Sequence, residues 1–247
     1  MRIINKIINR VLPKRFDKYW KKIEDSQNID STLRYITNRF IKSKSYKLTS
    51  SYWHILNISN YKSLFEFGIE KYGSTVAKNY YTFSKIYHDE WFDETINNLK
   101  DNPYKIDSVE LFKKQDGFSL NESITYNYLC YLLFYSLKKT NTFQHISKLN
   151  DRTYLGFNDP YIKIDDTNIT TDKIISLLDY EKIQKAFEVK KFKRILEIGA
   201  GSGRTSEAIL SIEKHFKYIL CDIAPALYIS YSRLKLAFPN KIISLLI

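Results

Sequence analysis

Glycine is concentrated in one short stretch of this chain, between positions 199 and 203. Three of the seven glycines of the 247-residue chain fall within these five positions. A largely apolar run, 195–198, precedes them, and a helical pattern begins at Arg204. A strand that ends in a glycine turn and opens a helix lets a ligand approach the backbone closely, with unpaired N–H groups facing it. The stretch therefore predicts a nucleotide-type binding site.

Two acidic residues narrow the class of ligand. Glu197 lies two residues before Gly199, and Asp222 directly follows a second predicted strand, 217–221. The dinucleotide fingerprint G-x-G-x-x-G requires a glycine where this chain has Arg204, which disfavours a nicotinamide-dependent oxidoreductase. A carboxylate at the end of the second strand is placed to accept hydrogen bonds from the ribose hydroxyls of an adenosine ligand. The alternative is that both acids are ordinary strand-end residues and that the glycines only shape a turn.

The segments around the glycine turn alternate between strands and helices. After the first strand at 195–198 we expect a helix at 204–215, the second strand at 217–221 and a helix at 225–238, followed by the apolar run 242–247. Alternation of this kind favours an α/β fold with a parallel, doubly wound sheet.

The part of the chain before this unit is predicted to be mainly helical. Apolar residues recur at helical spacing over 61–87, with breaks near the glycines 68 and 73, and over 121–139. Their aromatic stripes have two interpretations, a packed core or a surface that stacks on sugars. The run 88–90 (His-Asp-Glu) is either a candidate general base or a polar surface near a helix end.

Turn-forming residues separate the helical region from the glycine-rich unit. The run 161–164 alternates like a short strand, and 165–168 is typical of a loop or hairpin turn. Thr171 is the expected N-cap of the helix that leads into the first strand. We therefore divide the chain into a helical region, 1–150, and an α/β unit, 151–247.

Positive charge is unevenly spread along the chain. The formal net charge is +12, and residues 1–47 hold 13 Lys or Arg against 4 Asp or Glu. Within residues 1–23 apolar residues recur at helical spacing, and the basic residues lie largely off that stripe. This segment is either an amphipathic helix on an anionic membrane surface or a packing helix with a solvated basic face. Because Lys is abundant along the whole chain, the charge is weak support for a nucleic-acid partner.

The remaining composition indicates a reducing compartment. No apolar run is long enough to cross a bilayer, and the N-terminus lacks the features of a secretory signal. Cys130 and Cys221 are far apart in apolar contexts, which favours buried thiols over a disulfide. The four histidines show no metal-ligand spacing, so we predict no metal site. We expect a cytoplasmic protein, with residues 1–23 as the candidate for peripheral contact with the inner membrane surface.

Four stretches together resemble the bacterial sugar O-methyltransferases, a class I group that uses S-adenosylmethionine (SAM). The likeness covers about residues 60–247. Its SAM loop is specific for methyltransferases but not for their substrate, and its last stretch favours a sugar-directed group. Asp159, before Pro160, departs from the shorter turn of the group. The stretches are 64–83 (LFEFGIEKYGSTVAKNYYTF), 156–183 (GFNDPYIKIDDTNITTDKIISLLDYEKI), 195–204 (ILEIGAGSGR) and 222–241 (DIAPALYISYSRLKLAFPNK).

The resemblance implies a SAM-dependent methyltransferase that methylates a sugar hydroxyl of a polysaccharide or glycan precursor. The glycines of the loop would let the backbone pack against the methionine part of SAM. Glu197 would orient the loop or the amino group of the ligand, and Asp222 would hold the ribose. No catalytic base is assigned. The implied cofactor-binding residues are Glu197, Gly199, Ala200, Gly201, Gly203 and Asp222.

The resemblance also implies a sheet larger than residues 195–247 can form. Class I methyltransferases have seven strands in the order 3-2-1-4-5-7-6, and this segment has room for two strands and the beginning of a third. Its first strand would then have an unpaired edge, which invites pairing with another chain. We expect either an enzyme that needs a partner chain or a missing C-terminal half, or a non-catalytic module with a degenerate SAM fold.

Overall fold

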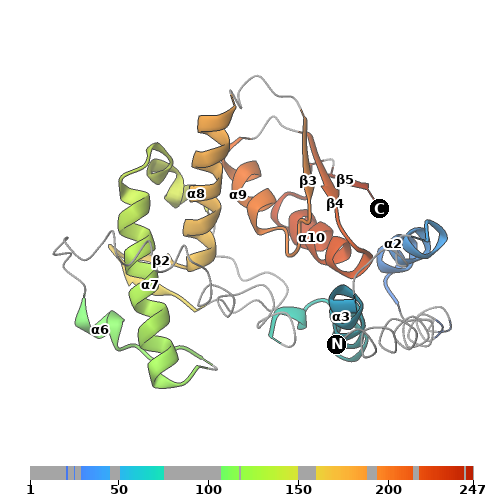
Figure 1. Cartoon of the computed structure of the whole chain (residues 1–247), viewed down its shortest axis with the longest axis horizontal. Coiled ribbons are helices and arrows are strands. Elements are labelled where there is room, and N and C mark those ends of the chain that lie inside the picture. Colours follow the sequence, from blue (N-terminus) through green and yellow to red (C-terminus); the bar gives the residue numbers. More distant parts are fainter. Residues whose placement is uncertain are drawn as a thin grey trace.

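Helices predominate in this protein, and its strands form two small sheets (Figure 1). The computed structural model describes residues 29–44, 51–74, 107–116, 118–149, 160–187, 194–213, 217–241 and 243–246, with the isolated positions 21 and 25. The predicted mixture of helix and sheet is confirmed within these ranges.

The described elements follow the predicted order closely. The helices are α2 (Ser31–Lys42), α3 (Ser51–Phe67), α6 (Ser108–Leu111), α7 (Leu120–Lys138), α8 (Thr171–Ala186), α9 (Arg204–Ile212) and α10 (Ala224–Ala237), with 3-10 turns η2 (Tyr72–Ser74) and η4 (Asn141–Lys148). The strands are β1 (Ile162–Ile164), β2 (Thr167–Ile169), β3 (Arg194–Ile198), β4 (Lys217–Cys221) and β5 (Ile243–Leu246).

The larger sheet contains the strands of the glycine-rich unit. Its order is β3-β4-β5, and both pairs are parallel. Parallel neighbours require a crossover connection, and here α9 lies between β3 and β4 in the chain while α10 lies between β4 and β5. The alternation predicted from the sequence therefore yields parallel strands, whose carboxyl ends meet at one edge of the sheet.

The smaller sheet is a hairpin before α8. Its first strand agrees with the predicted 161–164, but β2 begins at Thr167, within the stretch 165–168 that was predicted as a loop or hairpin turn. β1 and β2 pair antiparallel, with Ile164 opposite Thr167. The two residues between them, Asp165 and Asp166, have φ of 47° and 60°. Positive φ at both central positions is the geometry that continues the right-handed twist of the paired strands, and Asp tolerates it better than most residues.

The start of α8 differs by one position from the prediction. Thr170, and not Thr171, is the N-cap, because its side chain accepts a hydrogen bond from the backbone N–H of Lys173 at 3.1 Å. Thr171 lies in the first turn and is buried against the hydroxyl of Tyr126. Two adjacent threonines are equally good caps by type, so the tertiary contact decides between them.

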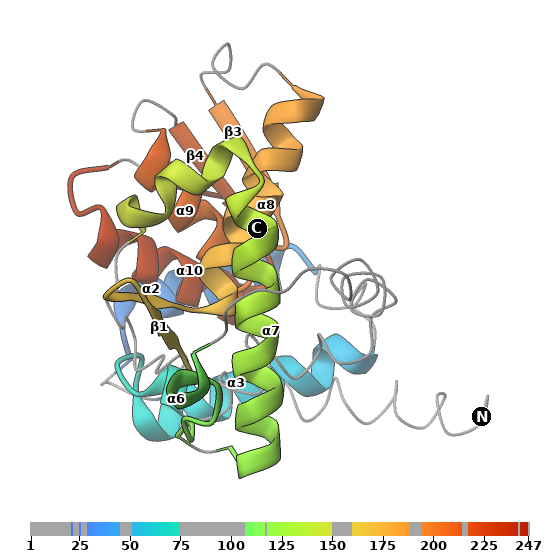
Figure 2. The ribbon, with the colours of Figure 1, turned by 90° about the vertical axis from the view of Figure 1, so that its left-hand side faces the viewer.

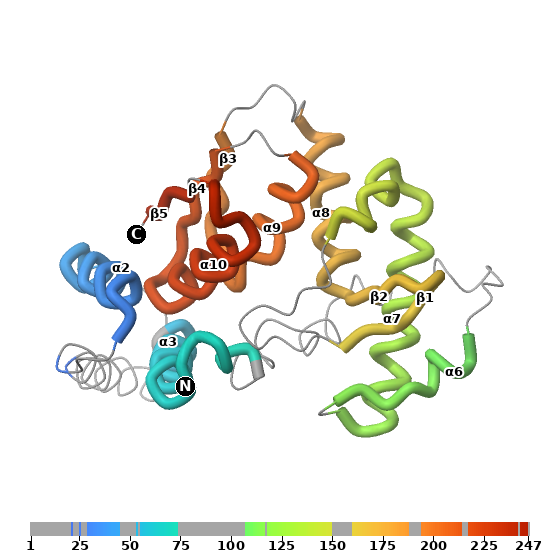
Figure 3. Tube along the Cα trace, turned by 180° about the vertical axis from the view of Figure 1, so that it is seen from behind, coloured from blue at the N-terminus to red at the C-terminus, as the bar shows by residue number. Residues whose placement is uncertain are grey.

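Helix α8 packs against both parts of the core. One cluster of buried residues joins α2, α3, α9, α10 and the parallel sheet, and the other joins α7 to the β1–β2 hairpin. Tyr180 of α8 lies in the first cluster, whereas Ile174 and Leu177 lie in the second. Figure 3 shows α8 between α7 and α9, and Figure 2 shows α2 beside α10. Helix α3 also contacts α10.

Several predictions concern residues outside the described ranges. These are the basic helix over residues 1–23, of which only position 21 is described, the run 88–90, and the turn at Asp159. The division at residue 150 also stays a prediction. Among the helices that the structure describes, none is both long enough and apolar enough to cross a membrane.

Candidate functional site

The glycine turn between β3 and α9 has a backbone that other residues adopt only with strain. Gly199, Gly201 and Gly203 have φ of 77°, 56° and 76°, in the left-handed region that glycine occupies at no steric cost. The free space around these glycines differs. A Cβ at Gly203 would lie 3.1 Å from the Cα of Ser230 on α10, whereas a Cβ at Gly199 would meet nothing within 4 Å. The first glycine therefore faces open space and the last one lies against a helix.

Asp222 fixes this turn from the neighbouring strand. Its Oδ2 accepts a hydrogen bond from the N–H of Gly201 at 2.7 Å, and its Oδ1 accepts one from the N–H of Ile223, also at 2.7 Å. The N–H of Gly199 donates to the carbonyl oxygen of Cys221 at 2.8 Å. Burial raises the pKa of the Asp222 carboxyl, and the two N–H donors partly oppose that rise. Each oxygen retains a lone pair for another donor.

Glu197 joins β3 to the next two elements. Its Oε2 accepts hydrogen bonds from the hydroxyl of Ser206 in α9 and from the hydroxyl of Tyr218 in β4, the latter at 3.0 Å. Burial raises the pKa of Glu197, and both hydroxyl donors lower it. These contacts favour the role of orienting the loop. The role toward the amino group of a ligand stays a prediction.

The other two predicted residues lie within the same turn. Ala200 is buried, and its carbonyl oxygen accepts a hydrogen bond from the N–H of Gly203 at 2.8 Å. All six predicted cofactor residues thus lie on three adjoining segments: the end of β3, the turn that follows it, and the end of β4. The carboxyl ends of parallel strands at a crossover are where open α/β sheets bind ligands.

An ion pair links the start of α9 to the start of α8. Arg204 Nη1 lies 3.0 Å from Oδ1 of Asp172, whose side chain is 11% exposed. Asp179 lies seven residues after Asp172, on the same face of α8. Burial raises the pKa of the Asp179 carboxyl, and Arg204 lowers it. In the sequence Arg204 is notable because it replaces the third glycine of the dinucleotide fingerprint, and neither aspartate was among the predicted site residues. Their seven-residue spacing, two helical turns, is the signal that was available.

A second ion pair fixes the far side of α9. Nε of Arg233 in α10 lies 2.5 Å from Oε2 of Glu207, and both side chains are 12% exposed. The helix that begins at the glycine turn is therefore held by charge pairs on two sides. These two ion pairs fix the position of α9, and therefore the position of a ligand site at its N-terminus.

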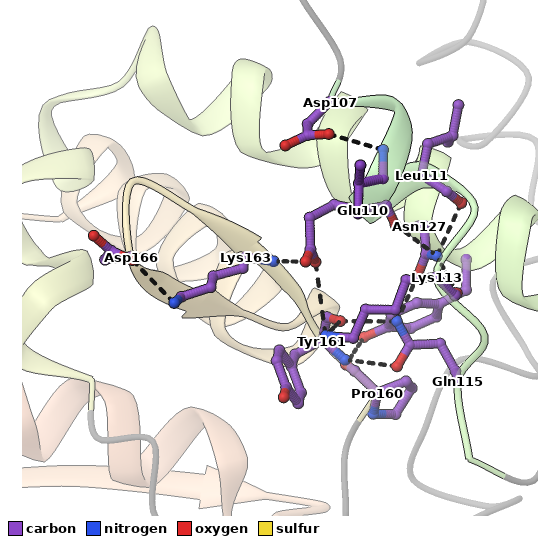
Figure 4. Close-up of polar contacts among 12 residues, drawn as sticks. Asp107, Glu110, Leu111, Lys113, Gln115, Asn127, Pro160, Tyr161, Lys163 and Asp166 are labelled. Atoms are coloured by element: carbon purple, nitrogen blue, oxygen red, sulfur yellow. Dashed lines mark hydrogen bonds and ion pairs between the residues drawn. The ribbon is translucent and has the colours of Figure 1, made fainter.

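A separate polar cluster lies around Asn127 of α7, between the segment that follows α6 and the start of the hairpin (Figure 4). The side-chain amide of Asn127 donates to three backbone carbonyl oxygens, at Glu110, Leu111 and Lys113. Gln115 exchanges hydrogen bonds with the backbone of Tyr161 in both directions. Because these amides have bonded partners, the cluster fixes the segment between α6 and α7 to the hairpin and leaves little capacity for a ligand.

The thiols and possible metal ligands give no second site. Cys130 is buried and Cys221 half-buried, and both are free. Burial raises the pKa of Cys130 to about 12 and also raises that of Cys221, so neither is a reactive thiolate at neutral pH. In the described part of the chain, His, Cys, Asp and Glu form no group of three or more that could hold a metal ion.

Comparison with known proteins gives no assignment. No family model, no curated protein and no solved structure matches this chain. The candidate site therefore depends on its own residues and geometry.

Proposed function

We propose that this chain binds SAM at the glycine turn and acts as an O-methyltransferase on a sugar hydroxyl. The observation that carries the proposal is the hydrogen bond from Gly201 N–H to Asp222, which places a carboxylate of β4 beside the left-handed turn that follows β3. The acceptor class comes from the sequence resemblance, through the segment 222–241.

The residues of the site fit an adenosine ligand with an amino-acid tail. Gly199 leaves open space at the turn, which is the room that a ligand needs to approach the backbone. Asp222 would accept hydrogen bonds from the ribose hydroxyls with its remaining lone pairs, while its present bonds keep the carboxylate in place. Glu197, held by Ser206 and Tyr218, would keep β3 and α9 in register beneath the ligand.

Such a site contributes to methyl transfer mainly by alignment. Bound SAM supplies an activated methyl group for in-line attack by a hydroxyl, and alignment of two reactants lowers the barrier by about 7–11 kcal/mol in favourable cases. The rigid turn and the two ion pairs of α9 would hold one reactant in a fixed place. The base that takes the hydroxyl proton is unassigned.

Calorimetric titration tests the ribose contact directly. We expect the wild-type protein to bind adenosine more tightly than 2′,3′-dideoxyadenosine, and Asp222→Asn to lose that preference, since an amide replaces the acceptor pair. Asp166→Asn is the matched control, because Asp166 is exposed in the hairpin turn. Equal affinity of the wild-type protein for both nucleosides, or no binding of SAM, would contradict the proposal.

A non-catalytic module that binds SAM is the second candidate. The observation that favours it is the exposed edge of β3, which within the described residues pairs only with β4. Transfer of labelled methyl from SAM to a glycan acceptor by the purified chain would exclude this candidate. Binding of SAM without transfer would favour it.

The cellular location forms part of the same proposal. We place the protein in the cytoplasm, with residues 1–23 as a peripheral contact to the inner membrane surface. Nucleic acid is not a proposed partner.

A further inference from the structure

A hollow of about 320 Å³ lies beside β3, on the side of the helices. Ile183 and Phe187 of α8 form one wall, and Thr205 and Ile209 of α9 form another. The third border is the sheet, with residues 194–197 of β3 and Tyr218 of β4.

The hollow lies on the face of the sheet that α8 and α9 cover. Tyr218 of β4 is paired with Ile195 and hydrogen-bonded to Glu197, and all three residues line the hollow. The hollow therefore lies beneath β3, next to the strand's second edge. Since β3 pairs with β4 alone among the described residues, its backbone donors and acceptors on this edge are available to another strand.

Apolar side chains are exposed on the opposite face of β3 and at the end of α8. Leu196 and Ile198 of β3 are 50% and 77% exposed, and Phe187 at the end of α8 is 58% exposed. Exposed β-strand edges of this kind are normally blunted by charge, proline or a covering element. Here only the first residue of the strand is basic, so the edge is suited to binding an apolar strand.

The two charged residues that line the hollow, Arg194 and Glu197, differ in whether their side chains have partners. Glu197 is engaged by Ser206 and Tyr218. The side chain of Arg194 is exposed and forms no ion pair or hydrogen bond with any residue that the structure describes. A strand lying along this edge would therefore gain from an acidic residue beside Arg194.

We propose that the β3 edge and its hollow bind an extended segment of another polypeptide, which adds a strand to the sheet. The segment has alternating apolar residues and an acidic residue that pairs with Arg194. Both existing pairs in the sheet are parallel, so the added strand is also parallel, and its acidic residue lies at its N-terminal end. Main-chain hydrogen bonds would supply affinity, and the hollow would supply specificity. The proposal does not depend on the proposed cofactor.

A short labelled peptide tests this surface. The probe begins with Asp and continues with alternating Val and Thr, and its binding to the full chain is followed by fluorescence anisotropy. We expect Leu196→Lys to weaken binding at least tenfold, because it places a charge on the edge. Leu236→Lys on α10, where Leu236 is 53% exposed, is the matched control and should bind as the wild type does.

A charge exchange tests the acidic residue of the partner. Arg194→Glu should bind the Asp-first peptide more weakly and bind a Lys-first peptide more tightly than the wild-type protein does. Peptide binding that is absent, or equal in the wild type and Leu196→Lys, would overturn the proposal. A dimer that Leu196→Lys converts to a monomer, with no peptide binding, would also overturn it, since a second copy would then occupy the edge. SAM affinity measured on the same variants separates failure of this surface from failure of the cofactor site.

Discussion

At the scale of single residues, the glycine turn shows which site features are local. The turn was predictable because left-handed backbone restricts the residue type wherever it occurs. The bonds of Glu197 and Asp222 were not, because Ser206 and Tyr218 lie 9 and 21 residues from Glu197, and Gly201 lies 21 residues from Asp222. Sequence spacing indicated that carboxylates end both strands, and only the fold shows that they hold the turn.

Gly199 and Gly203 have the same left-handed backbone conformation but different neighbours. We expect Gly199→Ala to lower the free energy of unfolding by about 1–2 kcal/mol, the cost of left-handed backbone for an L-residue. Gly203→Ala should cost more, because its methyl group would also lie 3.1 Å from the backbone of Ser230. Urea denaturation of both variants measures the difference. Equal losses would show that α10 moves aside freely.

Burial of Glu197 gives the stability a definite pH dependence. Burial raises its folded-state pKa above the ordinary value of 4.5, so the folded state binds this proton more tightly than the unfolded state. The resulting stability is present at pH below the unfolded pKa and is lost as pH rises through the folded pKa. Glu197→Gln should remove this component. Urea denaturation across pH tests it, and parallel pH curves for both proteins would contradict the prediction.

At the scale of elements, periodicity predicted the helices well and their contacts poorly. The helix predicted at 121–139 is observed as α7, and the one predicted at 225–238 is observed as α10. Both are apolar around most of their circumference, with consecutive buried residues, and α7 also begins with a capping box of Ser119 with Glu122. The pairing of Arg204 with Asp172 spans 32 residues, and no pattern along one helix specifies a partner on another.

The link between α8 and α9 should contribute measurably to stability. We expect Asp172→Asn to lower the free energy of unfolding by about 2 kcal/mol, the typical value for a hydrogen bond to a charged group. The exposed pair Lys62–Glu66, at 3.9 Å, is the control, and Glu66→Gln should cost no more than about 0.5 kcal/mol. Urea denaturation gives both values. Similar losses at the two sites would mean that the Arg204 pair has no special role in holding α8.

At the scale of the whole molecule, α8 makes the helical part and the sheet a connected structure. It contacts α7 and η4 on one side and α9 on the other, so residues before the glycine-rich unit help to position the glycine turn. The aromatic stripes divide between core and surface. Tyr61, Tyr72 and Tyr126 are almost fully buried, whereas Phe65, Phe67 and Tyr128 are exposed. The sequence could not assign the buried tyrosines to the two clusters, because burial depends on which helices meet.

The uneven charge of the chain leads to a prediction about residues 1–23. Residues 1–47 carry 13 basic against 4 acidic side chains, and attraction to anionic lipid amounts to about 1 kcal/mol per basic residue near the surface. We expect the full chain to sediment with vesicles that contain phosphatidylglycerol and to dissociate from them as the salt concentration rises. It should not bind vesicles of phosphatidylcholine alone. Removal of residues 1–23 should abolish sedimentation and leave SAM affinity unchanged. If the removal instead lowers the thermal unfolding temperature without changing vesicle binding, the segment is a packing helix.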